Sequence, residues 1–296
     1  MNQPTEKRRD ARAAAREKAH SLRQQQNRSD RRKRGFVLGG IVVGLVAVAV
    51  VVTVVIAGSI RPTVPGPKNM ASDGVLIESG LKVQETSALA ANASPRASTP
   101  NQAGGTVDIR IYADYLCPLC AQFVQTNMPQ LRPLVKDGAV TVEFHPVAVY
   151  TGRSAGTQYS VRAANAAACV VNYTPEAFWS FNEKLFRDQP EPGTPGLTDT
   201  QLLNDAVQAG AQPRSSLKSC IDNGRFENWV SQSTSRALNG PLPNSSVNNM
   251  TSALLVLVNG KPYKGSLTSA TQFKSFVIQS QGDEYSATTQ PTAPAS

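Results

Sequence analysis

Two cysteines separated by two residues, Cys117 and Cys120, constrain this chain more than any other feature. They follow residues 106–112, which alternate apolar and polar side chains as a half-buried β-strand does. A helix that begins at Cys117 would bring the two sulfurs close enough to bond. It would also leave the first sulfur beside unpaired backbone N–H groups. The sequence therefore predicts a strand, a tight turn and a helix that carries a thiol–disulfide pair in its first turn.

This arrangement suits thiol–disulfide exchange. Pro118 fits the first helical position, where a missing N–H has no cost. The helix dipole favours the Cys117 thiolate, so we expect an exposed Cys117 sulfur to carry the exchange and a more shielded Cys120 to resolve mixed disulfides. The alternatives are a structural disulfide or half of a zinc site. Zinc takes four ligands, and His145 is the only histidine that follows residue 60.

Residues 35–60 contain no charged side chain and are long enough to cross a hydrocarbon core of ~30 Å. They are predicted to form a single transmembrane helix. Four basic residues, 31–34, precede this span and no comparable cluster follows it, so residues 1–34 are expected to be cytoplasmic and the chain from about 61 onward to be exported. A cleaved signal peptide is the alternative, although both segments are longer than those of a usual signal. The prediction is a single-pass cell-membrane protein that contacts lipid through residues 35–60.

The formal charge of +9 is concentrated before this span. Residues 1–34 hold twelve Lys and Arg against four Asp and Glu, whereas the remainder holds eighteen against seventeen. The exported part is close to neutral, which argues against a nucleic-acid surface on it. All four cysteines follow the span, in a compartment where disulfides persist, and four cysteines suit two pairs.

Composition divides the exported part into three segments. Residues 61–104 are rich in Pro, Ala, Ser, Thr and Asn and are predicted to be a linker, with a possible edge strand at 74–80. Residues 105–281 are expected to form one folded domain, and the polar residues 282–296 a disordered tail.

The expected elements of the domain alternate between strand and helix patterns. Strands are predicted at 106–112, 139–147 and 254–258, the last closing on an Asn259-Gly260 hairpin turn. Between the second and third strands lies a helical block at about 154–238, with helices through Cys169 and at 175–186, 198–210 and 215–237, and a loop at 189–196. A helix at 271–279 completes the order.

With this order, the chain resembles the DsbA-like branch of the thioredoxin superfamily, in which a helical insertion interrupts the thioredoxin core. The resemblance spans roughly residues 70–281 and is carried by the strand that leads into residues 114–120, DYLCPLC, and by the late strand that ends in VNGK at 258–261. Membrane-anchored, actinobacterial-type relatives share it. The resemblance implies an α/β, thioredoxin-like fold with an inserted helical domain, preceded here by the transmembrane helix, and thiol chemistry on exported proteins.

The sequence departs from the family at two positions. Strongly oxidising members carry His between the cysteines, whereas this chain has Leu119, which should stabilise the thiolate less and make a weaker oxidant. The position of the superfamily's cis-proline, counted back from the late strand, falls at Leu254. A cis Ala253–Leu254 bond would cost ~3–4 kcal/mol, so a trans bond is expected. Pro241 or Pro243 is the alternative source of a shifted equivalent.

The resemblance also implies a structural disulfide between Cys169 and Cys220, joining two helices of the insertion. Two free buried thiols are the alternative. Asp114 is expected to accept a hydrogen bond where the helix begins and, secondarily, to tune thiol acidity. His145 is expected at the surface or at a strand edge. The aromatic residues at 178–181 are expected in the core rather than in a peptide groove.

Together these features favour an extracytoplasmic thiol–disulfide oxidoreductase that acts on exported protein thiols through Cys117 and Cys120. A membrane redox partner would recycle the cysteines, because the chain carries no quinone or flavin signature, and no cofactor or metal is expected. A weakly catalytic or non-catalytic peptide-binding chaperone of thioredoxin fold is the alternative that Leu254 suggests. A reductase or isomerase is a third, because direction depends on the partner's potential.

Overall fold

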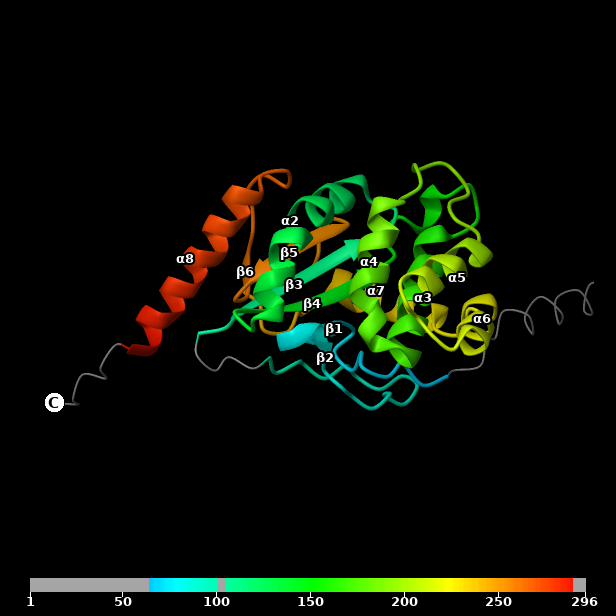
Figure 1. Cartoon of the computed structure of the whole chain (residues 1–296), viewed down its shortest axis with the longest axis horizontal. Helices are drawn as coiled ribbons and strands as arrows, with labels where there is room; N and C mark the ends of the chain where they lie inside the picture. Colours follow the sequence, from blue (N-terminus) through cyan, green and yellow to red (C-terminus); the bar gives the residue numbers. More distant parts are fainter. Residues whose placement is uncertain (1–63, 101–104, 290–296) are drawn as a thin grey trace, which may run out of the picture. The chain divides into compact units, whose positions relative to one another are not determined.

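The computed structural model describes residues 64–100 and 105–289. Its centre is a six-stranded sheet of order β2-β1-β4-β3-β5-β6 (Figure 1). Strands β3 and β4 are parallel and buried along their whole length, and β5 pairs antiparallel with β3. The strand bounds are Val75–Glu78 (β1), Lys82–Val83 (β2), Val107–Asp114 (β3), Val140–Val147 (β4), Leu254–Val258 (β5) and Lys261–Pro262 (β6).

Seven α-helices accompany the sheet in the described part of the chain. They are α2 (Pro118–Lys136), α3 (Tyr159–Tyr173), α4 (Phe178–Arg187), α5 (Asp199–Gln208), α6 (Arg214–Asp222), α7 (Glu227–Asn239) and α8 (Ala270–Thr289). Helix α2 links the parallel strands β3 and β4, and helices α3 to α7 are inserted between β4 and β5 (Figure 1). The predicted order of strands and helices is confirmed.

The predicted transmembrane span, residues 35–60, and the basic segment before it lie outside the described residues. Among the helices of residues 64–100 and 105–289, none combines the length and the apolar character that crossing a bilayer requires.

The two faces of the sheet pack against different elements. Ile109, Ile111 and Phe144 belong to the main hydrophobic cluster, to which α2, α4 and α8 also contribute. Tyr112 points the other way, into a second cluster with Ala237 of α7 and apolar residues of the loop before β5. The alternation predicted for the first strand is therefore confirmed, and both of its faces are buried.

Two helix boundaries differ from the prediction. The single helix expected at 215–237 is two helices, because Gly224 between α6 and α7 adopts φ +55°, a left-handed conformation that ends a helix. The disordered tail was expected to begin at residue 282. Its predicted start is wrong, because α8 continues to Thr289. Residues 290–296 lie outside the described residues.

The segment predicted to be a linker contacts the domain over residues 64–100. The possible strand at 74–80 is present as β1, but it pairs with β4 on one side and β2 on the other, so β2 forms the edge of the sheet. Asp73, just before β1, receives hydrogen bonds of 2.6 and 2.7 Å from Arg236 of α7. Main-chain bonds and an ion pair therefore hold a polar segment in place where composition alone predicts a spacer.

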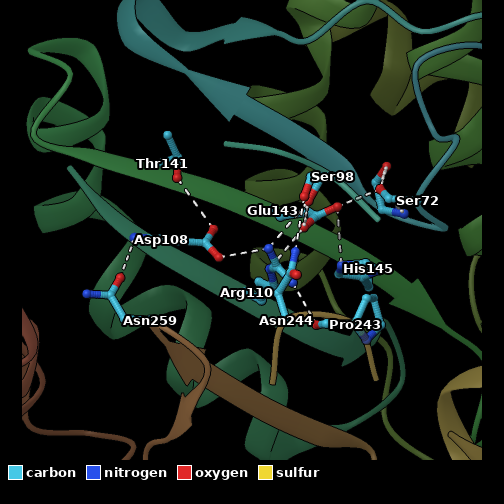
Figure 2. A network of polar contacts seen from close by, with 11 residues as sticks. Ser72, Ser98, Asp108, Arg110, Thr141, Glu143, His145, Pro243, Asn244 and Asn259 are labelled. Carbon is cyan, nitrogen blue, oxygen red and sulfur yellow. Dashed lines mark hydrogen bonds and ion pairs between the residues drawn. The ribbon is translucent and has the colours of Figure 1, made fainter. Parts of the chain in front are cut away.

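A buried ionic network lies among side chains of β3 and β4 (Figure 2). Arg110 of β3 is 1% exposed and forms ion pairs with Asp108 at 2.9 Å and with Glu143 of β4 at 3.1 Å. Its Nη1 donates to the carbonyl of Pro243 at 2.7 Å. The parallel register places Arg110 directly opposite Glu143, so sheet pairing creates the contact.

Serine hydroxyls complete the shell around Glu143. Ser72 donates to Oε1 at 2.5 Å and Ser98 donates to Oε2 at 2.6 Å. Burial would raise the pKa of Glu143, but His145, Arg110 and the Ser72 hydrogen bond favour the carboxylate and lower it to about 2. The network thus joins the segment before β3, the central strands and the loop before β5.

His145 is not at the surface or at a strand edge, as the sequence suggested. It is 2% exposed on β4, an internal strand because β1 lies beyond it, and its ring stacks on Tyr112 at 4.1 Å between centroids. A Cβ added to Gly74 would lie 2.6 Å from the His145 ring, so the main chain before β1 covers it.

Candidate active site

Cys117 and Cys120 form a disulfide at the point where β3 leads into α2. Cys117 is the N-cap of α2, and its Sγ accepts a hydrogen bond from the Cys120 N–H at 3.1 Å. Pro118 occupies the first helical position, as expected. The first sulfur therefore lies where helix N–H groups and the helix dipole stabilise negative charge.

The expectation that the first sulfur is exposed is wrong for this conformation. Cys117 is 1% exposed and belongs to the main hydrophobic cluster, as does Cys120. Its side chain folds back over the first turn of α2, whereas Leu119 points outward and is 52% exposed. The outward-facing residue of the motif is thus apolar, and Cys117 is covered in this conformation.

Asp114 organises the turn before Cys117. Its buried carboxylate accepts hydrogen bonds from Leu116 N at 2.8 Å, Ser160 Oγ at 2.7 Å and Tyr150 N at 2.7 Å. Burial raises the pKa of Asp114, and these hydrogen bonds partly offset the rise. Asp114 accepts a main-chain bond just before the helix, and it also ties the turn to α3 through Ser160.

The carbonyl of Ala253 faces the cysteines from the segment that enters β5. Cys120 Sγ lies 3.2 Å from this oxygen. The cis peptide bonds of the described residues precede Pro213 and Pro241, so the Ala253–Leu254 bond is trans. Pro241 lines a cavity of about 210 Å³ beside Tyr112. Tyr112 lies on the face of the sheet that points away from the cysteines. Backbone contact at the cis-proline position is thus present without a proline.

Gln189, the first residue after the C-cap of α4, was not among the residues that the sequence predicted to lie at the site. Its side-chain amide donates to the carbonyl of Tyr115 at 2.9 Å and to that of Cys117 at 3.2 Å. The sequence identified residues 189–196 only as a loop, and no local signal connects Gln189 with residues more than seventy positions earlier.

A second disulfide joins Cys169 of α3 to Cys220 of α6, with Cα atoms 5.9 Å apart. Both residues are buried. Closing a loop of 51 residues contributes up to ~4 kcal/mol by the chain-entropy argument. The aromatic residues Phe178, Trp179 and Phe181 are at most 3% exposed and belong to the core.

Comparison with known proteins gives consistent matches. A family model described as thioredoxin matches residues 103–250. Disulfide bond formation protein D of Bacillus subtilis is 30% identical over 121 residues, 40% of this chain and 51% of that protein. The oxidised structure of DsbA from Mycobacterium tuberculosis superposes with a TM-score of 0.53 and 26% identity, covering 73% of this chain and all of that one.

The serine/threonine-protein kinase PknE of Mycobacterium tuberculosis is 29% identical over 120 residues, which are 39% of this chain. The match spans only 21% of the kinase's length. The chain therefore covers about a fifth of one curated relative and about half of the other.

Proposed function

Because this chain belongs to the DsbA-like thiol–disulfide oxidoreductases of thioredoxin fold, we propose that it forms or exchanges disulfides in exported proteins through Cys117 and Cys120. The fold is α/β with an inserted helical region. The single observation that carries the proposal is the Cys117 sulfur, disulfide-bonded to Cys120 at the N-terminus of α2 and accepting a helix N–H.

The proposed reaction proceeds by two exchanges. A substrate thiolate attacks Cys117 Sγ, forming a mixed disulfide while the bond to Cys120 breaks and Cys120 leaves as a thiolate. A second substrate thiolate then attacks the substrate sulfur of the mixed disulfide, and Cys117 leaves as a thiolate. The substrate dithiol loses two electrons and the enzyme disulfide gains them. Hydrogen bonding to the Cys117 thiolate by helix N–H groups favours the final step.

The proposed location is the outer face of the cell membrane, with residues 35–60 as the anchor and residues 1–34 in the cytoplasm. The absence of charge in residues 35–60 and the basic residues before them support this orientation. Exported protein thiols would be the substrates. A membrane redox partner would reoxidise Cys117 and Cys120 after each turnover.

A peptide-binding chaperone of thioredoxin fold is the second candidate, because Leu254 stands where the family has proline. The contact between Cys120 and the Ala253 carbonyl favours the enzymatic function, since this backbone faces the cysteines even in the trans form. A net reductase or isomerase would use the same sulfurs with a different partner.

Oxidative refolding of a reduced protein tests the proposal. The full-length chain, added in catalytic amounts to reduced ribonuclease in a glutathione buffer, should accelerate the return of ribonuclease activity. The same chain, in an insulin-reduction assay, reports the reverse direction. A refolding rate equal to that of the buffer alone, with aggregation suppressed, would favour the chaperone function instead.

Leu119 sets the strength of the oxidant rather than the type of reaction. We predict that Leu119→His lowers the pKa of Cys117, because imidazole can donate a hydrogen bond or a positive charge to the thiolate. The glutathione redox equilibrium of the variant should shift towards the reduced enzyme. Leu119→Ala is the control and should shift neither quantity, since it removes apolar surface without adding a donor. Equal equilibria for all three proteins would contradict the prediction.

A further inference from the structure

We propose that Gln189 is a positioning residue for disulfide exchange. It lies in the helical insertion and holds the turn before α2 in the conformation that keeps the Cys117 sulfur on the helix N-terminus. The inference rests on the proposed function and extends it, because it assigns a role in the redox chemistry to a residue outside the thioredoxin core.

Two side chains of opposite hydrogen-bonding character hold this turn. Asp114 accepts from the N–H of Leu116 at 2.8 Å. Gln189 donates to the carbonyls on either side of that residue, Tyr115 at 2.9 Å and Cys117 at 3.2 Å. Asp114 thus satisfies a donor and Gln189 satisfies two acceptors of the same short segment. The side-chain amide of Gln189 therefore orients the peptide groups that follow Tyr115 and Cys117.

The orientation of the Cys117 carbonyl is linked to the position of the Cys117 sulfur relative to the first turn of α2. This carbonyl accepts the first helical bond from Ala121 N at 3.1 Å, and Cys117 has the extended N-cap conformation φ −87°, ψ 113°. Rotation about ψ would move the carbonyl and would change the relation between Sγ and the Cys120 N–H, now 3.1 Å apart. Pro118 has no N–H with which to stabilise the turn.

Reduction makes this support more important. In the oxidised enzyme the bond to Cys120 restrains the Cys117 sulfur covalently. After reduction that restraint is gone, and the hydrogen bonds around the turn hold the thiolate beside the helix N–H groups. An interaction that favours the thiolate stabilises the reduced enzyme and so strengthens the oxidant.

The segment that carries Gln189 is itself anchored. Gly193 N donates to the carbonyl of Arg153 at 2.6 Å, and Thr157 Oγ1 donates to the carbonyl of Pro195 at 2.5 Å. On the other side of Gln189, Asn182 of α4 accepts from the Tyr115 hydroxyl at 2.9 Å. Hydrogen bonds therefore restrain the chain before and after Gln189. They fix the position of its side-chain amide relative to the turn before α2.

The test uses two variants of Gln189 and one matched control in the full-length chain. Gln189→Ala removes the donor, and Gln189→Glu keeps the size of the side chain while an ionised carboxylate cannot donate. Gln125→Ala is the control, because Gln125 of α2 donates in the same way to the carbonyl of Phe186 of α4 at 2.7 Å, away from the cysteines. All three should have similar thermal stability.

The readouts are the pKa of Cys117, from the pH dependence of its alkylation, and the glutathione equilibrium of the peptide that contains Cys117 and Cys120, quantified by mass spectrometry. We expect both Gln189 variants to raise this pKa and to shift the equilibrium towards the disulfide, by about fivefold for Gln189→Ala, which is the size of one typical net hydrogen-bond contribution. Gln189→Glu should shift the equilibrium further, because its carboxylate also repels a thiolate. Gln125→Ala should leave both values at those of the wild type.

The outcomes separate the inference from the proposed function. If the wild type accelerates refolding but the Gln189 variants match it in pKa and in glutathione equilibrium, the positioning role is wrong and the proposed function stands. Equal shifts in the Gln125→Ala control would also overturn the inference, because they would indicate general loosening of α4. A wild type without refolding activity would remove the proposed function itself.

Discussion

Replacing Cys117 with serine will reduce catalysed disulfide exchange to the uncatalysed rate. A serine hydroxyl cannot form the mixed disulfide and is not a leaving group for a substrate thiolate. Ribonuclease refolding with Cys117→Ser should therefore proceed as in buffer alone. A variant that retains the wild-type rate would show that the exchange occurs elsewhere in the chain.

Cys120→Ser should behave differently, because it keeps the Cys117 nucleophile and lacks the resolving thiol. The reduced variant is expected to accumulate a mixed disulfide with an oxidised peptide, visible as a mass increase that a reductant removes. Such trapping would assign the attacking sulfur to Cys117. Loss of trapping in the Cys117→Ser, Cys120→Ser double variant is the necessary control.

The second pair of cysteines supplies a further control for these experiments. Replacing both Cys169 and Cys220 with alanine removes a disulfide that lies between α3 and α6. This variant should lose roughly 2–4 kcal/mol of stability while retaining exchange at temperatures where it is folded. Its activity would separate general destabilisation from loss of the reacting sulfurs.

Glu143→Gln is expected to destabilise the domain by about 3–5 kcal/mol. Arg110 is 1% exposed, and the substitution would remove one of its two ion-pair partners and leave buried positive charge poorly compensated. Unfolding in denaturant at neutral pH measures the change. A loss below about 1 kcal/mol would mean that Asp108 and the Pro243 carbonyl are sufficient for Arg110.

Glu183→Gln is the matched control. Glu183 pairs with Arg132 at the same distance, 3.1 Å, but the two side chains are 25% and 46% exposed. Solvent screening limits such a pair to about 0–1 kcal/mol. The contrast between two identical substitutions tests whether burial, rather than the ion pair as such, sets the cost.

The effect of Glu143→Gln should also depend on pH. The pKa of Glu143 is lowered from 4.5 to about 2 in the folded state, so the carboxylate contributes stability above pH 4.5 and loses it as the pH falls towards 2. The linkage amounts to about 3 kcal/mol. The difference in unfolding free energy between wild type and variant should therefore shrink over this range. A difference that stays constant would contradict the lowered pKa.

The pKa of Asp108, in the same network, is shifted in the opposite direction from that of Glu143. Burial raises its pKa from 3.8 to about 6, despite the nearby Arg110. Its contribution to stability is present below pH 3.8 and is lost as the pH rises through 6. Glu143 and Asp108 thus affect the free energy of unfolding over different pH ranges. The change in this free energy below pH 4.5 comes mainly from Glu143.

Local spacing was enough to predict the central features of this protein. The position of Cys117 after an alternating strand predicted the strand, turn and helix, since each depends on residues adjacent in the chain. The Asn259-Gly260 turn was predicted for the same reason, and both residues have positive φ in the structure, 45° and 74°. The disulfide in the first turn of a helix was therefore readable from a short stretch of sequence.

Features that join distant segments were not predictable in this way. The partners of Arg110 on β3 were not predictable, because nothing near Arg110 in the chain indicates Glu143 or the carbonyl of Pro243, which is 133 positions away. Cys117 was expected to be exposed, but it is buried in a hydrophobic cluster that is built from distant segments of the chain. Gln189 gave no signal, since its hydrogen bonds reach back 72 and 74 positions.

The order of elements and the place of a disulfide in the first turn of a helix followed from the sequence, because backbone propensity and the spacing of cysteines act over a few residues. Burial, ion pairing and the support of the active-site turn were decided by the tertiary structure. They depend on which surfaces come into contact when segments far apart in the chain pack together. In this protein the contacts of the buried Arg110 and of Gln189 in the loop after α4 are of this kind.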